Sequence, residues 1–365
     1  MVNNRLQSEA LDFLRFPMIV AVVFIHNDSS TITIQGVEVG SNSYMPLFYV
    51  SSTLFSQVIA SIAVPLFFFM SGFLFFLCAK FNKGVYFNKI KSRFRTLLIP
   101  YLFWNISFIT IHYVVSHLPG ISSSFSGVNY TWEYFTSALW GRYSEQENMS
   151  FPIVYQFWFI RDLMVIVILT PLIFYFLKFT KWYGLLAVGL CWFLNISIPY
   201  QYNVVNMVSL FFFMAGAHFS ICRKNLVEEV SLIRKNWIYL FYILVAIADL
   251  CTKKYTYNLF VHNIGILLGI ICCFKLSVYL LIKCNVKPIP FLSAASFFVF
   301  AVHNPWLLSM GCKKILFMIF QPENDLALTS LYFIIVLFVV IIALIFYYLL
   351  KRFLPRFTTV ITGGR

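Results

Sequence analysis

Charged residues are scarce in this chain: Asp, Glu, Lys and Arg make up 11% of its 365 residues. Soluble domains carry about 25% charged residues. This deficit excludes a disordered chain, a solenoid of soluble repeats and a coiled-coil rod. Hydrophobic residues make up 61% of the chain, and apolar runs of about 20 residues recur along its whole length. The composition therefore predicts a protein that crosses a membrane several times.

Metal-ligand and disulfide spacings are also missing from the sequence. The eight cysteines are scattered, several of them inside apolar runs, and no CxxC or Cys/His pattern occurs. The six histidines show no ligand spacing either. Cysteines inside apolar runs behave as small hydrophobic residues. We therefore expect neither a metal site nor a disulfide framework.

The apolar runs predict helices, because a barrel strand alternates apolar and polar residues whereas residues 331–350 are apolar almost throughout. We expect an all-α bundle of about ten transmembrane helices. It forms a single domain over residues 1–365, with a short basic tail at 351–365. No small-residue cleavage site follows the first apolar run, so we expect that run to be retained. The predicted spans are residues 11–27, 55–78, 97–115, 153–177, 183–199, 203–221, 237–250, 260–282, 291–311 and 328–350.

Lys and Arg are divided unevenly between the two sides of this predicted bundle. With the N-terminus inside, 19 of them fall in inner segments and 5 in outer segments. Because cytoplasmic loops are enriched in these residues, we expect both termini in the cytoplasm. The same rule accounts for most of the net charge of +14, so we expect no nucleic-acid partner. The long outer segments, residues 28–53 and 116–152, suit contact with a sugar or glycolipid, or plain solvent exposure.

The first predicted span carries polar groups that are costly inside a membrane. Asp12 and Arg15 are three residues apart and can pair on one helix face. Arg15 and His26 are eleven residues apart, which returns to nearly the same face at an axial separation of roughly 16 Å. One face thus offers a cation at its inner end and an imidazole at its outer end. The alternative is that Arg15 reaches the inner headgroups and His26 lies at the outer interface.

Two later spans also contain polar groups. Arg161 and Asp162 are adjacent, and adjacent helical residues diverge by about 100°, so we expect each to have its own partner. Their alternative role is an ion pair at the outer interface. Ser296 and His303 are seven residues apart and share a face. Pro305 follows shortly and frees backbone carbonyls at that depth, although His303 could equally be a histidine of the core.

Five stretches of the sequence, in order, resemble the integral-membrane acyltransferase family 3, which includes bacterial O-acetyltransferases of polysaccharide and O-antigen. They are LDFLRFPMIVAVVFIH, VPLFFFMSGFLFF, KIKSRFRTLLIPYLFW, FWFIRDL and SFFVFAVHNP. The late motif of the family commonly contains Tyr, where this chain has Phe297 and Phe300. The matching residues include Arg15, His26, Pro65, Ser71, Gly72, Arg93, Arg95, Pro100, Trp158, Ser296, His303 and Pro305.

The resemblance implies transfer of an acyl group, usually acetyl, from cytoplasmic acyl-CoA to a hydroxyl of a carbohydrate or glycolipid, such as lipopolysaccharide O-antigen. It implies a multi-pass protein of the bacterial cytoplasmic membrane. Such a transfer needs a base, and histidine is the usual choice because its pKa lies near working pH. We expect His26 to be this base, Asp28 to orient it, and His303 to be a second catalytic histidine.

The phosphates of CoA call for cations on the cytoplasmic side. Arg93 and Arg95 are the expected pair, because arginine binds phosphate with two parallel hydrogen bonds. Arg15 could hold the pyrophosphate or the pantetheine carbonyls. The acetyl-CoA site is thus expected at these three arginines. The residues expected at the acceptor are Trp158, Arg161, Ser296 and Asn304.

Two other classes of membrane protein compete with this hypothesis. A polysaccharide polymerase or lipid-linked sugar flippase often carries arginines in its large outer loops. Here residues 28–53 contain no Lys or Arg, and residues 116–152 contain only Arg142. A small-molecule transporter often shows paired repeats with broken helices, and no such pairing is present.

Overall fold

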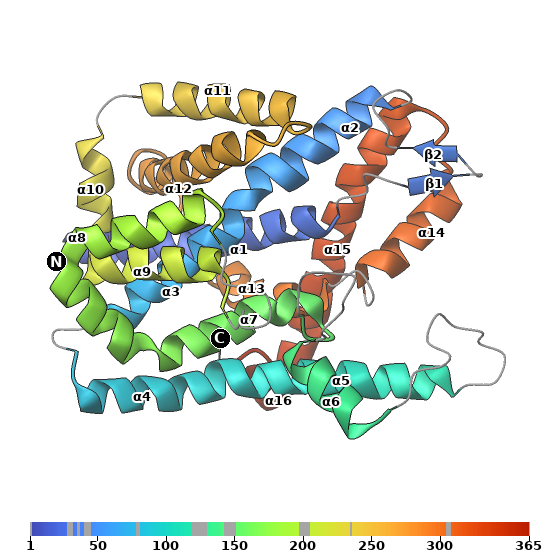
Figure 1. The fold of residues 1–365 in the computed structure, drawn as a ribbon. Helices are drawn as coiled ribbons and strands as arrows, with labels where there is room; N and C mark the ends of the chain where they lie inside the picture. The colour runs from blue at the N-terminus through green and yellow to red at the C-terminus, as the bar shows by residue number, and fades with distance from the viewer. Residues whose placement is uncertain are drawn as a thin grey trace.

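The computed structural model describes the chain as a helical bundle (Figure 1), which confirms the predicted all-α class. The elements that are not helical are the strands β1 (Ile32–Ile34) and β2 (Val37–Val39), which form an antiparallel hairpin. The described residues are 2–27, 32–34, 37–39, 45–77, 81–117, 130–141, 151–196, 205–233, 236–303 and 308–364.

Helix α1 (Val2–His26) runs through the middle of the bundle. It packs against α12 (Asn258–Lys283), α13 (Pro290–Val302) and α3 (Ala63–Phe76). Leu11, Leu14, Val22 and Val23 of α1 are all buried. Neighbouring helices therefore surround α1 on several sides.

The second span begins earlier than predicted, since helix runs without interruption from Pro46 to Phe76. It consists of α2 (Pro46–Ser52), the π-helical η1 (Thr53–Ile59), the short η2 (Ala60–Ile62) and α3. The prediction that residues 28–53 form one outer loop is therefore wrong for residues 46–52. The cause lies far along the chain, because the Asp325 carboxylate accepts hydrogen bonds from the backbone N–H groups of Leu47 and Phe48, at 2.7 and 2.8 Å.

The predicted span over residues 153–177 contains a sharp bend. The short η4 (Tyr155–Phe157) and α7 (Trp158–Ile168) meet α8 (Thr170–Phe193) at a bend of 66°. Pro171 explains the break, because proline removes a backbone donor and its ring clashes with the carbonyl four residues before it. A second break interrupts α8 at Lys181, whose φ of 55° is left-handed. This second break coincides with the gap predicted between residues 177 and 183.

The predicted span over residues 291–311 ends earlier than expected, because α13 ends at Val302 and His303 lies outside the helix. Helices also occur where outer or terminal segments were expected, namely α6 (Trp132–Trp140) and α16 (Pro355–Ile361). The remaining helices are α4 (Lys83–Arg93), η3 (Phe94–Leu98), α5 (Ile99–Ser116), α9 (Met207–Ile221), α10 (Leu226–Leu232), α11 (Trp237–Thr252), α14 (Met310–Phe320) and α15 (Asp325–Phe353).

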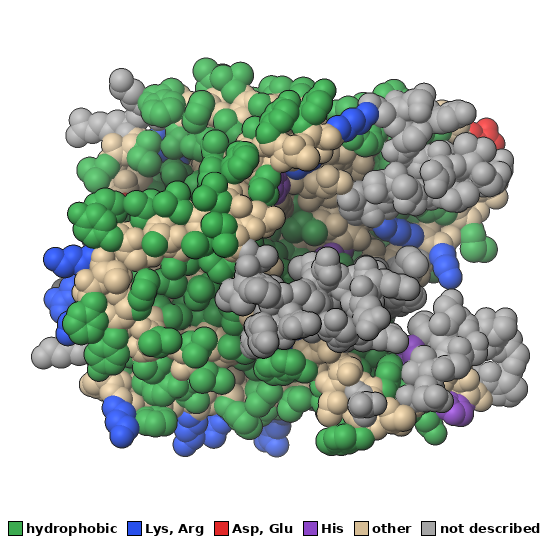
Figure 2. Space-filling model, in the orientation of Figure 1, with side chains coloured by type: hydrophobic (Ala, Val, Ile, Leu, Met, Phe, Trp, Pro, Cys, Tyr) green, Lys and Arg blue, Asp and Glu red, His purple; other side chains and the backbone are tan. Residues whose placement is uncertain are grey.

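Several of these helices are long enough to cross a bilayer. Within the described parts of the chain, Pro46–Phe76, Lys83–Ser116, Asn258–Lys283 and Asp325–Phe353 qualify singly, and two bent helix pairs raise the number to six. The protein is therefore an integral membrane protein. Lys and Arg gather at the left and lower left in Figure 2, where Figure 1 has the N-terminus and α4. The number of ten spans and the cytoplasmic location of both termini stay predictions.

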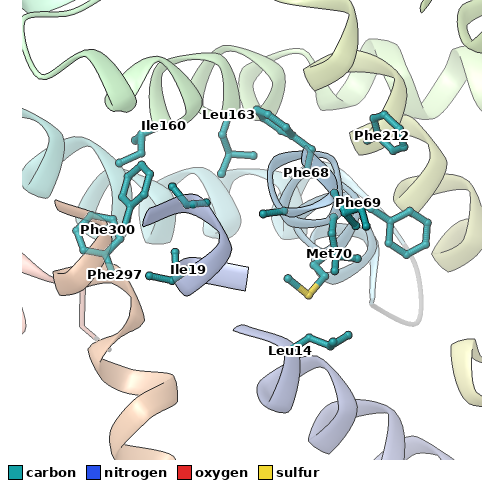
Figure 3. Close-up of a cluster of buried hydrophobic side chains, with 14 of the residues drawn as sticks. Leu14, Ile19, Phe68, Phe69, Met70, Ile160, Leu163, Phe212, Phe297 and Phe300 are labelled. Carbon is teal, nitrogen blue, oxygen red and sulfur yellow. The ribbon is translucent and has the colours of Figure 1, made fainter. Parts of the chain in front are cut away.

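Helices α3 and α9 cross at two glycines. A methyl group on Gly72 would overlap the Phe213 carbonyl oxygen and lie 2.8 Å from its carbon. A methyl group on Gly216 would meet the Phe69 carbonyl in the same way. Small residues at such crossings let membrane helices approach backbone to backbone. This crossing holds the phenylalanine-rich core, in which Phe68, Phe69 and Phe212 are buried (Figure 3).

Candidate active site

A cavity of about 320 Å³ lies where α1, α3, α7 and α13 meet. Its wall is mainly apolar, and Figure 3 shows Ile19, Ile160, Phe297 and Phe300 close together in this region. Such a wall suits the apolar parts of a ligand, which a few polar groups then orient. The polar residues of the wall are Arg15, Ser71, Arg93, Ser293 and Ser296.

One face of α1 forms a side of this cavity. Arg15, Ile19 and Val22 line it at helical spacing, and His26 lies one turn beyond Val22 on the same face. Arg15 forms the predicted ion pair with Asp12, with Arg15 Nη1 2.9 Å from Asp12 Oδ1. The sequence inference that Arg15 and His26 share a face therefore agrees with the geometry of this helix.

A second cavity of about 570 Å³ adjoins the first. Arg15 and Ser293 line both cavities, so Arg15 lies at their junction. Lys287 adds a second cation to this second cavity, while Glu9 and Asp12 add carboxylates. The two cavities together offer a charged mouth that leads to an apolar interior.

The two arginines of the predicted phosphate pair lie in different places. Arg93 lines the apolar cavity, where its guanidinium group is repelled by the positive charge of Arg15. Arg95 lies on η3, is exposed, and does not line either cavity. Two guanidinium groups on one cavity repel each other, and an anion placed between them would relieve this repulsion. The structure thus brings Arg93 together with Arg15 but leaves Arg95 outside.

The predicted histidines meet beyond the end of the apolar cavity. The rings of His26 and His303 stack with their centroids 5.1 Å apart and their planes inclined by 23°. His303 is fully buried, its Nδ1 lies 3.1 Å from the Val299 carbonyl oxygen, and its Nε2 has no hydrogen-bond partner among the described residues. His26 is half-buried, so its ring does not face lipid alone. Asp28, the predicted orienting carboxylate, and Asn304, a predicted acceptor residue, lie outside the described residues.

Tyr155 is a contact of His26 that the sequence did not reveal. Its hydroxyl forms a hydrogen bond with His26 Nδ1, and the two rings meet edge to face at 4.9 Å. The two residues are 129 positions apart, and no spacing rule links them. The hydroxyl comes from η4, the single turn that precedes the α7 motif.

Phe300 separates the cavity from the two histidines. Its side chain lines the apolar cavity, and its ring centroid lies 6.0 Å from that of His303. His26 itself is not part of the cavity wall. Phe300 therefore lies between this cavity and His303.

The remaining predicted site residues have mainly structural contacts. Arg161 and Asp162 have separate partners, as predicted, since Arg161 Nη1 donates a hydrogen bond to the Trp140 carbonyl at 3.0 Å. They also form the ion pair that was the alternative, with Arg161 Nη2 3.0 Å from Asp162 Oδ1. The side chains are long enough to fold back toward each other although their Cα–Cβ bonds diverge. Asp162 also accepts hydrogen bonds from Ser209 and the Asn206 backbone, which ties α7 to the start of α9. Arg161 is buried outside both cavities.

Ser296 and Trp158, both predicted to contact the carbohydrate acceptor, differ in their position relative to the apolar cavity. Ser296 lines it, and its hydroxyl donates a hydrogen bond to the Leu292 carbonyl at 2.9 Å. Trp158 packs its ring against Phe68, and the neighbouring Phe159 lines the cavity in its place.

Comparison with known proteins gives one match. A family model described as an acyltransferase domain matches residues 8–352. No curated protein and no solved structure matches the chain. The matched range includes both histidines and every residue that lines the apolar cavity.

Proposed function

The chain belongs to acyltransferase family 3, and from this premise we propose that it transfers an acyl group, in the simplest case acetyl, from cytoplasmic acyl-CoA to a hydroxyl of a cell-surface carbohydrate or glycolipid. As a family member it is a membrane-embedded acyltransferase enzyme. One observation carries the finer proposal: Arg15 lies at the junction of two cavities, and His26 lies on the same helix face beyond them. The proposed location is the bacterial cytoplasmic membrane.

The two cavities support acyl-CoA as the donor. Arg15, Lys287 and Arg93 supply cations for its phosphates, with Arg93 deepest. The apolar cavity suits the pantetheine arm and the acyl group, which carry few charges. Arg15 and His26 are roughly 16 Å apart along the helix, a separation comparable with the reach of a pantetheine arm.

The role of His26 as a base determines which of its two ring nitrogens carries the hydrogen. The imidazole accepts the proton of the sugar hydroxyl at Nε2, which requires that Nδ1 carries a hydrogen and donates it to the Tyr155 oxygen. The sugar oxygen then bonds to the thioester carbonyl carbon, and the carbon–sulfur bond breaks. The imidazolium returns its proton to the departing thiolate. Tyr155 positions the ring for this step, and His303 stacks on its face.

A transfer assay with purified protein tests the proposal. The protein in lipid nanodiscs is mixed with acetyl-CoA carrying a labelled acetyl group and with surface polysaccharide from which ester groups have been removed by mild alkali. We expect labelled ester on the polysaccharide and an unchanged distribution of chain lengths. A changed chain-length distribution without new ester would instead indicate the polymerase alternative, which the family match already disfavours.

The two arginines give a matched pair of variants. Arg93→Ala should raise the KM for acyl-CoA about tenfold or more, because hydrogen bonds to charged groups contribute about 1.5–3 kcal/mol. Arg95→Ala should leave this KM nearly unchanged, since Arg95 lies outside both cavities. Initial rates over a range of acyl-CoA concentrations measure both. Equal effects of the two substitutions would contradict the donor site at Arg93.

Phe300 should control access to the histidines. Phe300→Ala joins the cavity to the space around His303, so we expect several-fold faster hydrolysis of acyl-CoA when no acceptor is present. Phe297→Ala is the control, because Phe297 lines the same cavity and its loss costs similar packing. Release of free CoA thiol measures the hydrolysis. The role of Phe300 is refuted if both variants release thiol at the rate of the unchanged protein.

A further inference from the structure

A third pocket, away from His26 and His303, lies between the end of α5 and the start of α6. It measures about 250 Å³ and is lined by Ile109, Thr110, Tyr113, Tyr130, Thr131, Tyr134 and Phe135. Four of these seven side chains are aromatic, two carry aliphatic hydroxyls, and none is charged. The mechanism described above uses none of them.

The tyrosine rings of this pocket are held in place. The centroids of Tyr113 and Tyr130 are 4.9 Å apart with the rings edge to face, and those of Tyr130 and Tyr134 are 5.3 Å apart. The Tyr130 hydroxyl forms hydrogen bonds with His112 Nδ1 at 2.7 Å and Ser116 Oγ at 3.0 Å. This arrangement fixes the rings before any ligand binds, which lowers the entropy cost of binding.

The chemistry of the pocket fits one class of ligand. A sugar ring presents C–H groups on its faces, which pack against aromatic rings, and hydroxyls on its rim, which bond to the hydroxyls of Tyr and Thr. Among the described residues of the wall, none is a cation that could hold a phosphate and none is a carboxylate that could hold an amine. The wall therefore favours an uncharged sugar over an anionic or cationic ligand.

Tyrosines also gather at membrane interfaces, where they contact lipid headgroups one by one. The tyrosines of this pocket face one another around a shared space instead. Trp132, on the same short helix, shows the interfacial pattern: it is 77% exposed and does not line the pocket. The two kinds of aromatic residue can therefore be tested against each other.

The pocket connects to the proposed catalytic base through α5. Asn105 Oδ1 accepts a hydrogen bond from the Val154 backbone N–H at 3.2 Å, and the next residue, Tyr155, contacts His26. Tyr113 lies eight residues further along α5, about 12 Å along its axis. In Figure 1 the C-terminal ends of α1 and α5 both point to the right. The pocket and His26 thus lie toward the same end of the bundle, as contact of both with one glycan requires.

We propose that the pocket formed by Tyr113, Tyr130 and Tyr134 binds a neutral sugar ring of the acceptor, several sugar units away from the hydroxyl that receives the acyl group. This inference rests on the proposed function, because it makes the pocket a second contact for a polymeric acceptor. The pocket selects long carbohydrate over short carbohydrate. It contributes to binding and takes no part in proton transfer.

Kinetics with two sizes of acceptor test the proposal. The acceptors are the alkali-treated surface polysaccharide and the single repeating unit prepared from it. Tyr113→Leu should raise the KM for the polysaccharide about tenfold, which corresponds to about 1.4 kcal/mol of lost binding. The kcat, the KM for the repeating unit and the KM for acyl-CoA should not change. Tyr113→Phe keeps the ring and should restore most of the affinity, and Trp132→Ala should behave like the unchanged protein.

A binding measurement without turnover separates this inference from the proposed function. Nanodiscs that carry His26→Ala are passed over immobilised, alkali-treated polysaccharide. Binding that Tyr113→Leu weakens and Trp132→Ala does not would support the pocket, even if no variant transfers an acyl group. The pocket assignment is overturned if Tyr113→Leu changes neither the polysaccharide KM nor this binding, or if Trp132→Ala has an equal effect.

Discussion

Replacing His26 with alanine should abolish acyl transfer and leave the folded bundle intact. A positioned general base contributes about 10²–10⁴-fold to a rate, so the residual activity should lie near the background of the assay. The side chain is half-buried at the end of α1, and its removal leaves the buried residues of that helix in place. Transfer of labelled acetyl to alkali-treated polysaccharide measures the rate, and thermal unfolding in detergent measures the fold.

A second histidine provides the control for this experiment. His262 lies on α12, where its Nδ1 is 2.8 Å from Asp249 Oδ2, and it lines neither cavity. His262→Ala should retain acyl transfer. Tyr155→Phe should lower kcat without removing it, because the imidazole keeps its place against His303 but loses the hydroxyl that fixes its tautomer. Near-normal acylation by His26→Ala would remove the assignment of this residue as the base.

Replacing Gly72 with alanine should prevent stable assembly of α3 with α9. The added methyl group would overlap backbone atoms of Phe213, which cannot move aside as a flexible side chain can. We expect a loss of more than about 3 kcal/mol, at the upper end of the cost of overpacking. Gly216→Ala should act in the same way from the opposite helix. Thermal unfolding and the yield of monodisperse protein in detergent measure the effect.

Gly311 is the matched control for the crossing. A methyl group there would meet no atom within 4 Å, so Gly311→Ala should change stability by no more than about 0.5 kcal/mol in either direction. A folded Gly72→Ala protein with an unchanged unfolding temperature would show that the two helices are not packed backbone to backbone.

The sequence predicted features that depend on one helix at a time. Apolar runs gave the helical class, and helical spacing gave the shared face of Arg15 and His26 and the pair of Asp12 with Arg15. The family resemblance is confirmed by the match over residues 8–352. The break at Pro171 had a visible signal, since proline at that position cannot continue a straight helix.

Features that depend on packing between helices could not be predicted from the sequence. How the helices meet determines the contact of Tyr155 with His26 and the place of Phe300 between the cavity and His303. It also determines that Arg93 lines the cavity and Arg95 does not. The spacing rule favoured separate partners for Arg161 and Asp162, which they have, but it missed their direct contact. The rule describes where the Cα–Cβ bonds point, whereas long side chains can fold back. The early start of α2 depended on Asp325, which lies 278 residues beyond Leu47 in the chain.

The length of the uninterrupted helix from Lys83 to Ser116 has a consequence for its placement in the bilayer. Its 34 residues extend for about 51 Å, whereas the hydrocarbon layer is about 30 Å thick. The helix is therefore about 20 Å longer than this layer is thick, so it tilts or projects beyond the layer, and the tyrosine pocket lies near its C-terminal end.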